Sequence, residues 1–166
     1  MFRLPETKPE HVFTELAFYL WRVRFEPDQE WLPELMFNGS EKALATIRDA
    51  IQTMREEFKT QGQSTRKFLC NPPEDVDVLR FARENKAEIE WQIWLVLRME
   101  QHVSEGTTYE VKNKAVTVRL NDQMAAEFTR VLDDYLKPGA IHMNGLPVPG
   151  NLFLALDWLG IEVWSE

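Results

Sequence analysis

Hydrophobic positions along the chain alternate as on a strand and then recur every three or four residues as on a helix, and this succession occurs in both halves. In the first half residues 35–37 alternate, and Ser40 carries a side-chain oxygen suited to cap the helix that follows. In the second half residues 116–118 alternate, and Asn121 occupies the matching position. Each half therefore predicts a strand followed by a long amphipathic helix.

A further strand is expected upstream of each strand and helix. Residues 19–26 and 93–100 are both rich in large apolar side chains, and both end in arginine, a large apolar residue and glutamate. The likeness suggests a duplicated strand-strand-helix unit, covering residues 16–60 and 88–137. The alternative interpretation is coincidence, because apolar spacings within any two strand-helix units often agree.

Alternation is most regular over residues 88–99, which predicts one long, mostly central strand. Trp94, Val96 and Arg98 fall on the face opposite its longer apolar stripe. A return strand through residues 109–111 gives the second half one strand more than the first.

Together these elements predict an α+β fold: an antiparallel sheet of about five strands with the two long helices packed on one face. A single domain, residues 1–166, is expected, because 44% of the residues are hydrophobic and suffice for a core. The C-terminal tail, residues 138–166, should pack on this core to bury its own apolar side chains. Pro33 favours an edge position for the strand that follows it.

The chain has one cysteine, Cys70, which excludes a disulfide within it. The first residues lack the apolar stretch of a secretory signal, so a reducing, cytoplasmic location is expected. The longest strongly apolar run, around residues 93–97, is far shorter than the roughly 20 residues of a membrane-spanning helix. We therefore expect a protein that does not span a membrane.

Negative charge is concentrated in the second part of the sequence. The net charge is −8, with 10 basic and 11 acidic residues in 1–67 but 9 basic and 16 acidic residues in 68–166. Such a field repels phosphate backbones, which makes nucleic acid an improbable partner. It suits another protein with a basic surface, although the acids could simply maintain solubility.

Motifs for metal, phosphate or nucleotide binding are not found in the sequence. The three histidines lie far apart and have no metal-ligand spacing, and no glycine-rich phosphate loop precedes a helix. A nucleophile could pair Cys70 with His102 or His142, but a single cysteine beside a strand is more often a small buried hydrophobe. We assign no catalytic residue, no cofactor and no metal site.

Recognition is the remaining hypothesis. Trp94 and Val96, followed by Arg98, have the composition of a protein-binding hot spot if their face is open to water, and of ordinary core if it is covered. Trp158 and Trp164 in the tail complete the set of candidate interaction residues. We expect a non-catalytic protein-binding module that holds another protein or a second copy of itself.

The rival hypothesis is a small enzyme or a ligand-binding protein. Its pocket would lie between the sheet and the C-terminal tail and would be lined by Trp94, His142 and Asp157. The distinguishing feature is convergence of titratable groups, because an enzyme needs at least two of them in one concavity.

Overall fold

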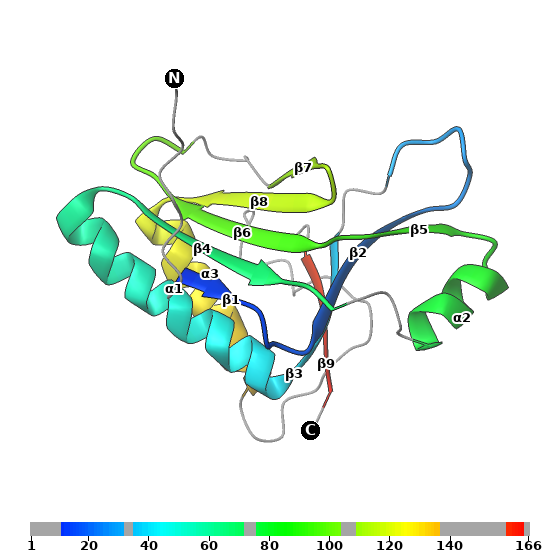
Figure 1. Ribbon diagram of the computed structural model, residues 1–166, viewed down its shortest axis with the longest axis horizontal. Helices are drawn as coiled ribbons and strands as arrows, with labels where there is room; N and C mark the ends of the chain where they lie inside the picture. Colours follow the sequence, from blue (N-terminus) through cyan, green and yellow to red (C-terminus); the bar gives the residue numbers. More distant parts are fainter. Residues whose placement is uncertain (1–10, 32–34, 72–75, 104–108, 137–158, 165–166) are drawn as a thin grey trace.

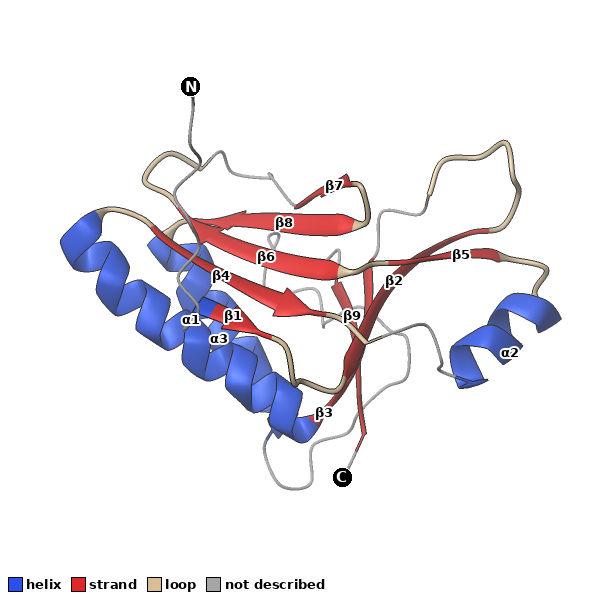
Figure 2. Ribbon diagram, viewed as in Figure 1, coloured by secondary structure: helices blue, strands red, loops and turns tan. Residues whose placement is uncertain are grey.

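The computed structural model describes residues 11–31, 35–71, 76–103, 109–136 and 159–164. These residues form three helices and nine strands, and the strands belong to two sheets (Figures 1 and 2). The predicted α+β class is confirmed, but the strands are not arranged as the single antiparallel sheet expected from the sequence.

The larger sheet has five strands in the order β1-β4-β6-β8-β7. Their bounds are Val12–Phe13 (β1), Ser64–Leu69 (β4), Trp94–Met99 (β6), Tyr109–Lys112 (β7) and Ala115–Leu120 (β8). Two pairs, β4 with β6 and β7 with β8, are antiparallel, whereas β1 is parallel to β4 and β6 is parallel to β8. Because the chain leaves β6 for the edge strand β7 before it returns as β8, β8 runs in the direction of β6. The prediction of an antiparallel sheet is therefore wrong.

The smaller sheet has the order β5-β2-β3-β9. Its strands are Phe18–Arg24 (β2), Leu35–Ser40 (β3), Glu88–Trp91 (β5) and Leu159–Trp164 (β9). β3 lies between β2 and β9, and all six of its residues are buried. The edge position predicted for this strand is wrong, because β3 pairs with β2 on one side and β9 on the other, and its first residue, Leu35, comes after Pro33 in the sequence.

The helices are Glu41–Gln61 (α1), Val76–Glu84 (α2) and Asp122–Leu136 (α3). The predicted caps are confirmed, because Ser40 Oγ and Asn121 Oδ1 accept hydrogen bonds of 3.0 and 2.8 Å from backbone N–H groups of the first turns of α1 and α3. Gly62 caps the C-terminus of α1, because its φ of 75° suits glycine and its N–H donates to the carbonyl of Phe58. α2 is a third helix beyond the two long ones.

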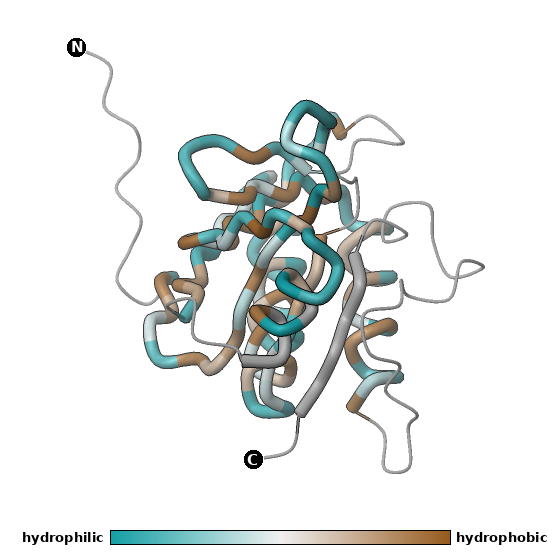
Figure 3. Tube along the Cα trace, turned by 90° about the vertical axis from the view of Figure 1, so that its right-hand side faces the viewer, coloured by the Kyte–Doolittle hydropathy of each residue, from teal (hydrophilic) through white to brown (hydrophobic). Residues whose placement is uncertain are grey.

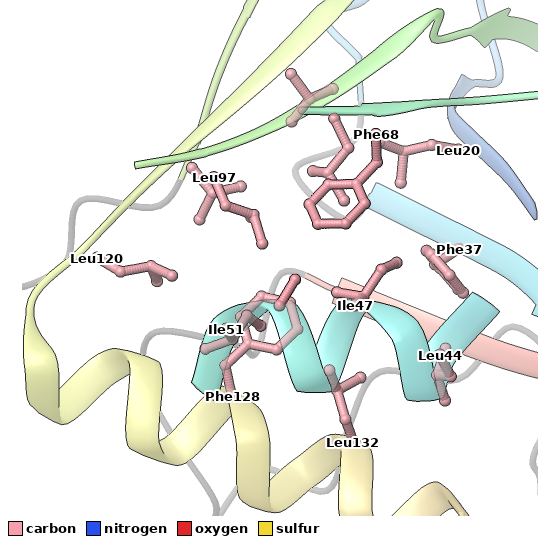
Figure 4. Close-up of a cluster of buried hydrophobic side chains, with 14 of the residues drawn as sticks. Leu20, Phe37, Leu44, Ile47, Ile51, Phe68, Leu97, Leu120, Phe128 and Leu132 are labelled. Atoms are coloured by element: carbon pink, nitrogen blue, oxygen red, sulfur yellow. The ribbon is translucent and has the colours of Figure 1, made fainter. Parts of the chain in front are cut away.

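The two long helices lie on the same face of the larger sheet, as Figure 1 shows, and they contact each other. α1 packs against β4 and β6, and α3 packs against β8. Buried side chains from both layers meet between them, among them Ile51 of α1, Leu97 of β6 and Phe128 of α3 (Figure 4). α2 lies apart from this core, next to the start of β5 (Figure 1).

The long strand predicted over residues 88–99 is divided between the two sheets. At the junction the N–H of Gln92 donates to the carbonyl of Leu20 in β2, at 2.8 Å, and the N–H of Ile93 donates to the carbonyl of Lys114, at 2.7 Å. The backbone therefore passes from the smaller sheet to the larger one at this point. Ile93 is 47% exposed and does not continue the apolar stripe.

The two halves of the chain share element types but not strand pairing. In the first half β2 and β3 are antiparallel neighbours, whereas in the second half β6 and β8 are parallel neighbours. The duplicated unit stays a hypothesis from the sequence, and its two copies differ in topology.

Hydrophobic and hydrophilic positions are interspersed along the trace in Figure 3. None of the helices that the structure describes combines the length and the apolarity needed to cross a membrane. This agrees with the short apolar runs of the sequence.

Candidate interaction surface

The candidate residues on β6 share one face of the larger sheet. Leu95 and Leu97 belong to the core beneath the helices, so Trp94, Val96 and Arg98, which alternate with them, are directed to the opposite face. Both α1 and α3 pack on the core side. The sequence prediction that these three side chains lie opposite the core stripe is thus reproduced by the strand geometry.

Pairing across β4, β6, β8 and β7 determines which residues surround them. We call the side of the sheet away from α1 and α3 the outer face. By strand register and alternation it is formed by Thr65, Lys67, Leu69, Trp94, Val96, Arg98, Glu110, Lys112, Ala115, Thr117 and Arg119. Trp94 pairs with Leu69 on one side and Ala115 on the other, which makes this end of the face the more apolar one.

The candidate residues differ in exposure. Trp94 and Arg98 are partly exposed, whereas Val96 is only 6% exposed and offers little area for contact. Ile93, next to Trp94 at the junction of the two sheets, adds exposed apolar surface. The accessible part of the outer face therefore includes an indole and a guanidinium.

The outer face is basic although the protein is acidic. Four of its residues are basic and one is acidic, a net charge of +3, or +2 when Glu100, which follows β6 and pairs with Arg119, is included, against −8 for the whole chain. Within the described ranges, no ion pair joins Lys67, Arg98 or Lys112 to a carboxylate. The whole-chain charge that we used to predict a basic partner does not represent this surface.

The two tail tryptophans are placed differently. Trp164 is the last residue of β9, where its backbone pairs with Ser40 of β3 in the smaller sheet. Trp158 lies outside the described residues. The structure therefore puts Trp164 and Trp94 on strands of different sheets.

The residues considered for catalysis do not converge where they are described. Cys70 follows Leu69, which pairs with Trp94 at the start of β6. His102 lies beyond Met99, at the opposite end of β6. The length of β6, roughly 17 Å at about 3.3 Å per residue, separates the two. Burial raises the pKa of the Cys70 thiol to about 12, which suits a buried hydrophobe rather than a nucleophile.

The pocket proposed for the rival hypothesis is not assembled by the described residues. His142 and Asp157 both lie outside them, so their relation to Trp94 stays a prediction from the sequence. Within the described part of the chain, no group of three or more histidine, cysteine, aspartate or glutamate side chains could hold a metal ion.

A buried polar cluster joins α1 to β4, and the sequence reasoning missed it. Arg66, 4% exposed, forms an ion pair with Glu57, with 2.6 Å between Nη2 and Oε1. The same oxygen accepts a 2.8 Å hydrogen bond from Ser64, and His11 Nε2 lies 3.8 Å from the second oxygen. Burial acts to raise the pKa of Glu57, but the hydrogen bonds from Ser64 and Arg66, together with the nearby charges of Arg66 and His11, outweigh it, so the pKa is lowered. The alternation of residues along β4, which directs Ser64 and Arg66 to the core side, is the sequence signal that could have indicated this cluster.

A second polar arrangement fastens β5 to β2. Arg22 pairs with Glu90 at 2.8 Å, and Arg24 pairs with Glu88 at 2.6 Å. Both guanidinium groups lie over the ring of Trp31, 4.9 and 4.4 Å from its centroid. These arginines have their counter-charges within the protein, so we interpret the arrangement as structural.

No protein-family model matches this chain, and no curated protein matches it.

Proposed function

We propose that the protein is a non-catalytic protein-binding module and that it binds through the outer face. The observation that carries this proposal is the partly exposed Trp94 on a sheet face whose other side holds the helices and the core. Tryptophan and arginine are the residues most often found at binding hot spots. A reducing, cytoplasmic location and the absence of a nucleic-acid or membrane partner belong to the same proposal.

The chemistry of the outer face supports recognition more than catalysis. Among its described residues Glu110 is the one carboxylate, and cysteine and histidine do not occur. A general acid or base would need a second titratable partner in a concavity. An aromatic side chain with charged neighbours needs no such partner to bind a protein surface.

Site-specific photo-crosslinking tests the proposal. A benzophenone amino acid is placed at Thr117, on the outer face beside Val96, and in a second protein at Gln52, an exposed position of α1. In cells that express the protein naturally, we expect a crosslink to another polypeptide from Thr117 and none of comparable yield from Gln52. Equal yields, or a crosslink from Gln52 alone, would contradict binding through the outer face.

The same measurement distinguishes the two kinds of partner. A product of twice the mass of the chain indicates a second copy, and any other mass indicates a different protein. Urea unfolding of both substituted proteins serves as the control that neither substitution disturbs the fold.

A further inference from the structure

Two arginines lie side by side on the outer face. The pairing of β6 with β8 places Arg98 next to Arg119, and neighbouring strands in a sheet are about 4.8 Å apart. Lys67 lies one row away on β4, opposite Val96. Like charges at directly neighbouring positions destabilise a sheet, so this arrangement has a cost in the isolated protein.

Arg98 differs in its pairing from the other arginines of the described strands. Arg22, Arg24, Arg66 and Arg119 each form an ion pair with a glutamate at 2.6 to 3.4 Å. For Arg98 the described residues provide no such pair. Within the described part of the chain, Arg98, which lies on the basic face, is thus the one strand arginine that has no carboxylate partner.

We infer that the outer face binds an acidic segment of a protein partner, with a carboxylate on Arg98 and an apolar side chain against Trp94. This inference rests on the proposed function and adds the chemistry of the partner. A guanidinium binds a carboxylate through two parallel charge-assisted hydrogen bonds. Lys67 supplies further positive charge near Arg98, whereas Arg119 is already paired with Glu110 and Glu100. For this face the inference replaces the basic partner that the net charge suggested.

Protein fits this surface better than single-stranded nucleic acid does. Sheets that bind single strands usually stack successive bases on two or three aromatic side chains. Among the described residues of the outer face, Trp94 is the one aromatic side chain. The net charge of −8 also opposes the approach of a long phosphate backbone, whereas a short acidic segment need contact the basic face alone.

Selection from a random peptide library tests the inference without assuming a sequence. Phage-displayed peptides are selected on the intact protein, and those that also bind a Trp94→Ala, Arg98→Glu double variant are removed. The remaining peptides are synthesised, and their affinities are measured by fluorescence anisotropy. Arg83→Glu is the matched control, because Arg83 is an exposed residue of α2 and the change in charge is the same.

We expect the selected peptides to be rich in aspartate and glutamate and to contain an apolar residue. They should bind Arg98→Glu at least about tenfold more weakly than the unchanged protein, and bind Arg83→Glu within about twofold of it. Urea unfolding shows whether each variant is folded, and Arg98→Gln repeats the test without introducing a negative charge.

Three results would overturn the inference. They are selected peptides that are neutral or basic, the absence of any peptide that distinguishes the double variant, and tighter binding of a short oligothymidylate than of the best acidic peptide. If Thr117 nevertheless forms a crosslink to a protein, any of these results would contradict only the acidic partner, and the proposed function would still hold. If the crosslink from Thr117 also fails, the proposed function fails with it.

Discussion

Arg66 and Glu57 form an ion pair of 2.6 Å between Nη2 and Oε1, and this pair connects the inner side of β4 to the last turns of α1. The Arg66 side chain is almost completely buried, whereas the Glu57 side chain is 24% exposed. A buried charge is tolerated when its partner and hydrogen bonds are in place, and Ser64 completes the set on Glu57. The pair therefore lets an arginine occupy a core position of the larger sheet.

Removal of the carboxylate should leave that guanidinium without a counter-charge. We expect Glu57→Ala to lower the free energy of unfolding by about 2–3 kcal/mol, less than for a fully buried pair because Glu57 keeps some exposure. Glu56→Ala is the matched control, since the neighbouring side chain is 75% exposed and should change stability by less than about 0.5 kcal/mol. Urea unfolding measures both, and equal effects would show that the pair does not stabilise the fold.

The free energy of unfolding should also depend on pH, because Glu57 titrates at acidic pH. Its pKa in the folded protein is lowered, so its contribution is fully present above the unfolded value of about 4.3 and is lost as pH falls through the folded value. The Asp122 carboxyl, bonded to Arg55, has a lowered pKa and acts in the same direction. The free energy of unfolding should fall between about pH 5 and pH 3, and it should fall less in Glu57→Gln. The same fall in both proteins would contradict this assignment.

The core between the helices and the larger sheet predicts large effects from single truncations. Ile51 is 0% and Leu132 is 2% exposed, and they come from different helices. Ile51→Ala and Leu132→Ala should each cost about 2–5 kcal/mol, because both leave cavities in packed surroundings. The exposed Gln52→Ala is the control. Losses below roughly 1 kcal/mol in both truncations would mean that these faces are not core.

Cys70 should be unreactive in the folded protein. With a pKa of about 12 and 6% exposure, almost none of the thiol is ionised or accessible at pH 8. Alkylation by iodoacetamide should be slow in buffer and fast in denaturing urea, as followed by mass spectrometry. Rapid alkylation in buffer would indicate an accessible thiolate and would reopen the catalytic hypothesis.

Local patterns predicted the elements well, because their signals lie within a few residues. Ser40 and Asn121 were identified as caps from their side chains, and both accept hydrogen bonds from the first turns of their helices. Strand pairing depends on contacts between distant residues, so alternation alone could not show that β6 and β8 are parallel or that β9 joins β3. The passage of the backbone from one sheet to the other at Gln92 could not be predicted, because the alternation of apolar residues in the sequence continues across this position.

The candidate surface was predictable in part for the same reason. Alternation along one strand placed Trp94, Val96 and Arg98 on a common face. The neighbours that make this face basic, Arg119 and Lys67, lie on other strands and are brought there by the pairing register. Net charge counted along the sequence therefore gave the opposite sign to the charge at the candidate site.

If a protein binds the outer face through Trp94, the crosslink from Thr117 should depend on that side chain, and crosslinking in variant backgrounds measures this dependence. Trp94→Ala should reduce the yield of the crosslinked partner at least about tenfold, since truncation of a hot-spot tryptophan costs about 2 kcal/mol or more. Phe25→Ala is the control, because Phe25 is a 44% exposed aromatic residue that does not belong to the outer face, and the yield should stay within about twofold. An unchanged yield in a folded Trp94→Ala protein would contradict binding through Trp94.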